Sequence, residues 1–354
     1  MRYAYVGCRS TKERNARGKG LKVFEISNET GDWKEIQCLK TEENPSYQTL
    51  DREEKYLYSV HGDFTVVSSY RILEDHTLEP LNTVDIGGKN PVFIVPDRTN
   101  QYLVVAALQG GAVYVIRRME DGSLGEIVNE LHFEGKKEGD VSFAHQCIWD
   151  QTQEYLFVVM QGRIQGYGQV QVLRFHPENG SFTRTDQYLS PNVYDEPRHL
   201  AVHPNNRWLY LINEKGNKMT FFEFDWEKGT LTARQNLPTL PATYTGEGQA
   251  SAAVLNEKGD ILIGSNRIHE SLVLYRIDQK TGYMKELGYY PCLGLTPRFV
   301  TFSPDYSRFY VANEDSDTIV EMKLDSDRGL MEYTGRIIPT ESPVCITFSR
   351  EVKA

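Results

Sequence analysis

The chain has 354 residues, with 39 basic and 49 acidic side chains and a formal net charge of −10. This acidity argues against general binding to nucleic acids or anionic membranes, because their phosphates repel a negatively charged surface. No apolar run approaches the roughly 18 residues of a membrane-spanning helix, so the sequence predicts no such helix.

The first residues, MRYAYVG, have the pattern of a β-strand rather than that of a secretory signal. The five cysteines are odd in number and scattered, and no CxxC pair occurs; they are Cys8, Cys38, Cys147, Cys292 and Cys345. Such spacing favours reduced thiols over disulfides or a metal site. We therefore expect a cytoplasmic protein without a bound metal.

Strand-like segments follow one another along the whole chain, and no segment has a sustained helical period. After residues 3–7 they are YLYSV, VVSSY, YLVVA, AVYVIR, YLFVV, VQVLRF, WLYLI, TFFEF, LVLYRI, FYVAN and TIVEMKL. Each alternates or is continuously β-rich, and each is bounded by Gly, Asp, Asn or Pro. The pattern predicts an all-β protein.

The same unit recurs at intervals of 46 to 53 residues, with starts at Pro45, Pro91, Ala144, Pro197, Ala250, Pro297 and Pro343. A short apolar strand, a polar turn and a second apolar strand at this period are typical of a propeller blade. The turns MEDGSL, HPENGSF, DWEKGTL, DQKTGYM and DSDRGL suit the hairpin between the outer two strands. A four-stranded unit cannot bury both faces alone, so we expect the blades to stack around a channel.

The two ends of the chain complete one blade. Residues 3–7 match the second strand of the other units, and the missing first strand reappears as PVCITF at residues 343–348. Pairing these segments would close the ring and remove its last exposed strand edges. We therefore predict that residues 1–354 form one domain, a seven-bladed β-propeller with four-stranded antiparallel blades.

The longest irregular stretches are residues 131–144, 189–196 and 238–249, each just before the start of a unit. Extra length on one face of a repeat protein usually builds a site. In an antiparallel blade, the start of the inner strand and the end of the next strand lie at the same face. Aligning the units there brings together four inner-strand residues, His145, Arg198, His199 and Arg298. Four more residues come from the ends of the second strands, Arg9, Glu214, Arg267 and Glu314.

A carboxylate, imidazoles and guanidiniums at one place can move protons and hold an anion. We assign His145, Glu214, Arg267 and Arg198 as candidate catalytic residues. The candidate substrate-binding residues are His199, His269, Arg298 and Arg9. The structural alternative is that Glu214 and Arg267 form a salt bridge between blades. No GxSxG, HExxH or Cys/His cluster occurs, and we expect no cofactor.

Several segments resemble the lactonase family of seven-bladed propellers, which includes bacterial 6-phosphogluconolactonases and fungal 3-carboxy-cis,cis-muconate lactonizing enzymes. They are YVGCRS, NPSYQTL, PRHLAVHPNNRWLYLINE, GSNRIHESLVLYRID and TPRFVTFSPDYSRFYVANE. By motif match, the resemblance implies that His145, Arg198, Glu214 and Arg267 form the active site. The chain departs from the family pattern at Ser142, where many members have a second histidine, at residues 107–110 and at Ala253. These departures imply an altered substrate pocket.

Three functions remain open from the sequence. The first is hydrolysis of a sugar-derived lactone, with His145 or Glu214 taking a proton from water and the arginines holding the oxyanion. The second is a cofactor-free cycloisomerase that acts on a carboxylated, muconate-like diacid. The third is a scaffold that binds a ligand without turnover. The expected partner is a small lactone or sugar acid, and the sequence leaves the oligomeric state open.

Overall fold

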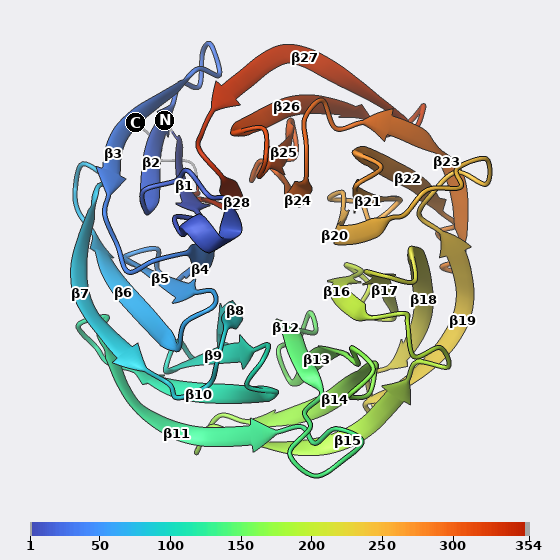
Figure 1. The fold of residues 1–354 in the computed structure, drawn as a ribbon, viewed down its shortest axis with the longest axis horizontal. Helices are drawn as coiled ribbons and strands as arrows, with labels where there is room; N and C mark the ends of the chain where they lie inside the picture. The colour runs from blue at the N-terminus through green and yellow to red at the C-terminus, as the bar shows by residue number, and fades with distance from the viewer. Residues whose placement is uncertain (1, 351–354) are drawn as a thin grey trace.

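In the computed structural model, which describes residues 2–350, seven four-stranded antiparallel sheets surround a central channel (Figure 1). The predicted all-β, seven-bladed propeller is confirmed. Each sheet runs in sequence order from the channel outwards, except that the chain's last strand is innermost in the blade where the chain begins. The only helix among the described residues is the three-residue η1 (Lys12–Arg14), so no helix there could cross a membrane.

We number the blades from the one that contains both ends of the chain. Blade 1 consists of β28 (Pro343–Phe348), β1 (Arg2–Cys8), β2 (Leu21–Ile26) and β3 (Trp33–Leu39). Blade 2 consists of β4 (Pro45–Leu50), β5 (Tyr56–His61), β6 (Val66–Ile72) and β7 (Leu78–Asp85). Blade 3 consists of β8 (Pro91–Pro96), β9 (Tyr102–Ala107), β10 (Ala112–Arg118) and β11 (Leu124–His132). Blade 4 consists of β12 (Phe143–Trp149), β13 (Tyr155–Gln161), β14 (Gln169–His176) and β15 (Ser181–Leu189).

The remaining blades follow the same order. Blade 5 consists of β16 (Pro197–Val202), β17 (Trp208–Asn213), β18 (Lys218–Asp225) and β19 (Thr230–Pro238). Blade 6 consists of β20 (Gln249–Leu255), β21 (Ile261–Arg267), β22 (Ser271–Ile277) and β23 (Met284–Pro291). Blade 7 consists of β24 (Pro297–Phe302), β25 (Phe309–Asn313), β26 (Thr318–Asp325) and β27 (Leu330–Pro339).

An acidic side chain shapes the turn after the inner strand in three blades. Asp51 Oδ1 accepts the backbone N–H groups of Lys55 and Tyr56 at 2.7 and 3.0 Å, where β5 begins. Asp97 and Asp150 accept two N–H groups in the same way in blades 3 and 4. Each carboxylate satisfies donors that the turn would otherwise leave unpaired, and it fixes the register of the hairpin.

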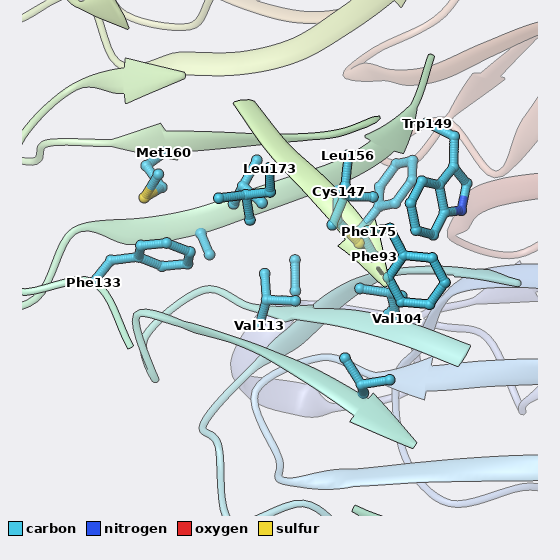
Figure 2. Packing of buried hydrophobic residues seen from close by; sticks show 14 of the residues in the cluster. Phe93, Val104, Val113, Phe133, Cys147, Trp149, Leu156, Met160, Leu173 and Phe175 are labelled. Atoms are coloured by element: carbon cyan, nitrogen blue, oxygen red, sulfur yellow. Dashed lines mark hydrogen bonds between the residues drawn. The ribbon is translucent and has the colours of Figure 1, made fainter. Parts of the chain in front are cut away.

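The core lies between the blades, as seven apolar clusters, one for each pair of neighbouring sheets in the described chain. Figure 2 shows the cluster between blades 3 and 4, where Phe93 and Val113 face Leu156, Leu173 and Phe175. The indole N–H of Trp149 crosses this boundary and donates to the carbonyl of Pro96 at 2.9 Å. Because each sheet is covered on both faces, the strand ends at the channel are held rigidly.

The ring closes as predicted, through antiparallel pairing of β1 with β28. Ala4 lies opposite Phe348 and Val6 lies opposite Ile346. The predicted irregular stretches connect an outer strand with the next inner strand, so they lie on the face where the inner strands start. Residues 9–20, between β1 and β2, lie on the same face. In Figure 1 the blue coil of η1 is close to the centre of the ring, beside β28 and β4.

Ending the chain after Thr340 should destabilise the protein strongly, because this removes β28 and leaves β1 with an open edge. Three buried side chains, Val344, Cys345 and Ile346, would be lost. Full burial of an aliphatic side chain of this size contributes about 1.5–3 kcal/mol. Chemical denaturation should show a large fall in the unfolding free energy. A control chain that ends after Ser349 retains β28 and should stay close to the full chain; equal stability of the two truncated chains would contradict the closure.

Candidate active site

The structure gathers the predicted polar residues at one end of the channel. The inner strands β12, β16 and β24 carry His145, Arg198 with His199, and Arg298 near their starts. Arg267 ends β21, while Glu214, Glu314 and Arg9 directly follow β17, β25 and β1. The antiparallel register explains the convergence, since Pro197 pairs with Asn213 and Pro297 pairs with Asn313. We call this end of the channel the mouth.

Glu214 is the centre of a buried ion-pair cluster that joins three blades. Its Oε2 lies 3.1 Å from Nε of Arg198 in the same blade, and its Oε1 lies 3.0 Å from Nη2 of Arg267 in blade 6. From blade 4, Nε2 of Gln161 donates to Oε2 at 2.8 Å. The three charged side chains are 3–12% exposed. The ion pair between Glu214 and Arg267 is therefore buried and is not a surface salt bridge.

The electrostatics of the cluster keep Glu214 ionised. Burial alone would raise the pKa of the Glu214 carboxyl, but Arg267 and Arg198 outweigh it and lower the pKa from 4.5 to about 2. A carboxylate with so low a pKa is a weak proton acceptor near neutral pH. Its geometry suits it to hold the two guanidiniums in place.

Arg198 is fixed on several sides. Its Nη1 donates to the carbonyl of Ser251 at 2.7 Å and lies 3.3 Å from Nε2 of His199. Burial, followed by the charge of Arg267, lowers the pKa of Arg198 well below its usual value. The charged guanidinium is thus short of counter-charge, and an anion in the mouth would be stabilised by it.

Two imidazoles lie next to these guanidiniums. The rings of His145 and His199 meet edge to face with centroids 5.2 Å apart. Burial, and then the charge of Arg198, lowers the pKa of each imidazole well below 6.5. Nδ1 of His145 is buried and has no hydrogen-bond partner among the described residues. His145 is therefore a neutral imidazole with a ring nitrogen that is not engaged by the protein.

Aromatic rings form a floor beneath the mouth. Tyr47 and Phe93 stack with centroids 3.9 Å apart, and Phe93 meets the edge of His199 at 5.8 Å. Phe299 approaches Tyr47 at 6.2 Å. Beyond this layer lies a cavity of about 570 Å³, lined largely by apolar side chains towards the opposite face, where Pro204 and Tyr306 lie. The floor lies between the charged mouth and this part of the channel.

A second cluster at the mouth repeats the arrangement of the first. Glu314 occupies in blade 7 the position of Glu214 in blade 5; its Oε1 lies 3.2 Å from Nε of Arg9, and its Oε2 lies 3.6 Å from Nη1 of Arg298. Arg298 belongs to the same blade and Arg9 to the next, as Arg198 and Arg267 do around Glu214. Nη1 of Arg9 also lies 3.5 Å from Asp63 Oδ2, and Nε of Arg14 donates to Asp63 at 2.8 Å.

One predicted residue makes its contacts elsewhere. Nδ1 of His269 is 2.7 Å from Ser271 Oγ, and its ring meets the edge of Tyr244, in the loop that precedes β20. The sequence prediction did not include Gln161, although it occupies the same register position as Glu214 and Arg267. It also left out Asp63 and Arg14, which lie in loops outside that register. In the described chain, no three His, Cys, Asp or Glu side chains are grouped so that they could hold a metal ion.

Replacing Glu214 with glutamine should lower the unfolding free energy by about 3–5 kcal/mol at neutral pH, because two guanidiniums remain buried without their carboxylate. Because folding lowers the pKa of Glu214, its ionised carboxylate stabilises the folded state. This stabilisation is complete above pH 4.5 and is lost as the pH falls towards about 2. The difference between wild type and Glu214→Gln, measured by denaturant unfolding, should therefore shrink in this window. A difference that is small and independent of pH would contradict the proposed role of the buried pairs.

Comparisons with known proteins agree with the fold. A family model described as "Lactonase, 7-bladed beta-propeller" matches residues 3–348. The chain is 24% identical to a 6-phosphogluconolactonase of Bacillus subtilis, over 98% of this chain and 99% of that protein. Among solved structures, the periplasmic gluconolactonase PpgL of Pseudomonas aeruginosa is 24% identical with a TM-score of 0.86, over 99% of both chains. A protein from Lactobacillus plantarum is 21% identical with a TM-score of 0.88, over 99% of this chain and all of the other.

Proposed function

The chain belongs to the lactonase family of seven-bladed β-propellers, and on this basis we propose that it hydrolyses a sugar-derived lactone without a cofactor, as a 6-phosphogluconolactonase-like enzyme. One observation carries the proposal. The neutral imidazole of His145, whose buried Nδ1 has no hydrogen-bond partner among the described residues, lies at the same mouth as two guanidiniums that Glu214 holds. These groups match the two demands of lactone hydrolysis, a base for water and positive charge for the oxyanion.

In the proposed reaction, His145 takes a proton from water as the water oxygen bonds to the lactone carbonyl carbon. The carbonyl oxygen becomes an oxyanion, which the guanidiniums of Arg198 and Arg267 stabilise. When the tetrahedral intermediate collapses, the bond from the carbonyl carbon to the ring oxygen breaks. The imidazolium of His145 returns its proton to the leaving alkoxide, and the product is an open-chain hydroxy acid.

The structure favours His145 over Glu214 as the base. Glu214 forms ion pairs with two arginines and accepts a hydrogen bond from Gln161. The pKa of its carboxyl is about 2. We assign Glu214 as a positioning residue that fixes Arg198 and Arg267. His145 is neutral near pH 7, and the negative charge of an arriving substrate would offset the neighbouring guanidiniums and make the imidazole a better proton acceptor.

A His145→Gln variant should lose about 10²–10⁴ in kcat, the usual contribution of a general base. The rate of acid release from glucono-δ-lactone and its 6-phosphate should be followed by pH-stat, with spontaneous hydrolysis subtracted. His176→Gln is a matched control, because His176 lies in the same blade and bonds to Thr183 in the outer hairpin. The proposal fails if His145→Gln stays within a few-fold of wild type, or if the folded wild type turns over no lactone.

The pH profile should show the protonation state of His145. The base must be neutral, and its pKa lies well below 6.5, so activity should be lost only at a pH below that value. We expect kcat/KM to stay constant from about pH 8 to about pH 6.5 and then to fall on further acidification. An acid limb with a midpoint at or above pH 6.5 would contradict the assignment of His145 as a buried neutral base.

A further inference from the structure

The mouth contains more guanidiniums than carboxylates in each of its two clusters. Glu214 pairs with two arginines, Arg198 and Arg267. In the second cluster, two carboxylates pair with three arginines; these residues are Glu314, Asp63, Arg9, Arg14 and Arg298. Each cluster therefore has one cation that its own carboxylates do not balance. Arg14 is 43% exposed, so the unbalanced charge is buried in the first cluster and lies partly at the surface in the second; an anion would balance either one.

Arg298 is the least engaged cation of the second cluster. Its distance to Glu314 is 3.6 Å, against 3.2 Å for Arg9, and its side chain is 22% exposed against 3% for Arg9. Burial and then Arg198 lower the pKa of His145, and Arg298 is the next contributor. The positive charge of Arg298, in blade 7, therefore disfavours protonation of His145, which lies across the mouth in blade 4. Of the two guanidiniums that pair with Glu314, that of Arg298 is therefore the one more open to a ligand.

Arg9 is held rigidly behind Arg298. Its Nε and Nη1 are buried and make no hydrogen bond to any described residue, although they face Glu314 and Asp63 in ion pairs. Burial, and then the charge of Arg298, lowers the pKa of Arg9 to about 9. The positive charges of Arg9 and Arg298 thus repel each other, and an anion bound next to both would offset this repulsion.

The loop of residues 9–20 forms a fixed wall at this side of the mouth. Arg14 ties the loop to Asp63 in blade 2, and Arg17 ties it to Asp317 in blade 7. Arg17 Nη2 also donates to the backbone carbonyl of Glu314 at 3.1 Å. Because the loop is anchored on both sides, the second cluster is preformed, and a ligand would not have to order it.

We propose that Arg298 and Arg9, held by Glu314 and Asp63, bind an acidic group of the substrate that is remote from its lactone carbonyl. This inference rests on the proposed function, which places the carbonyl beside His145, Arg198 and Arg267. One unbalanced guanidinium then stabilises the developing oxyanion, and the other selects a carboxylate or a phosphate ester at the far end of the substrate. Both groups are oxyanions that guanidinium donors recognise.

The test compares a neutral lactone, glucono-δ-lactone, with two acidic lactones, its 6-phosphate and the carboxylated saccharolactone. Wild type should show a kcat/KM about tenfold or more higher for at least one acidic lactone, and the preferred one identifies the acidic group. Arg298→Met should lower kcat/KM for that lactone about tenfold more than for glucono-δ-lactone. Arg276→Met is the matched control, because Arg276 is in blade 6 and pairs with Asp260 in the turn at the opposite face. It should leave the preference intact.

A binding experiment separates this inference from the proposed function. Calorimetry with wild type should show tighter binding of 6-phosphogluconate or saccharate than of gluconate, whether or not any lactone is turned over. Tighter binding without turnover would support the second anion position and contradict the hydrolase. Turnover without any preference, or equal loss on all lactones in Arg298→Met, would overturn the second position and leave the hydrolase intact. If Arg298→Met does not fold, the wild-type preference still decides.

Discussion

The buried carboxylate of Glu214 is the interaction on which the mouth depends. It joins arginines from blades 5 and 6, and Gln161 extends the contact to blade 4. Without its charge, two guanidiniums would repel each other in a place that water hardly reaches. With it, both are held at fixed positions beside His145, and the positive charge is in place before a substrate arrives. Catalysis by oriented charge requires such preorganisation.

The propeller supplies this preorganisation by repetition. Equivalent positions in successive blades lie on a circle around the channel, so residues distant in sequence meet without a dedicated loop. The same arrangement of ion pairs occurs twice, around Glu214 and around Glu314. Each of these glutamates pairs with one arginine of its own blade and one of the next blade. The aromatic floor of Tyr47, Phe93 and Phe299 closes the mouth from below. The outer strands and the apolar layers between blades hold these positions.

The repeat made the fold predictable, because strand, turn and strand recur with a period that only radial stacking satisfies. The same register predicts that His145, Arg198, Glu214 and Arg267 lie at one place, where the structure also has them. It could not show that the carboxylate of Glu214 is buried and strongly acidic, because this depends on how far side chains reach across the channel. It also missed Asp63 and Arg14, which lie in loops outside the register. His269, which we predicted to bind substrate, contacts Ser271 at the start of β22 and Tyr244 in the loop before β20.

In the proposed reaction the mouth adds water to a lactone, and an isotope experiment can follow the oxygen of that water. Turnover in water enriched in ¹⁸O, well above the spontaneous rate, should place one solvent oxygen in the carboxylate of the product, as mass spectrometry can detect. His145→Gln should slow this incorporation to near the spontaneous rate. A product formed by wild type with the mass of the substrate and no solvent oxygen would contradict hydrolysis and indicate an isomerase.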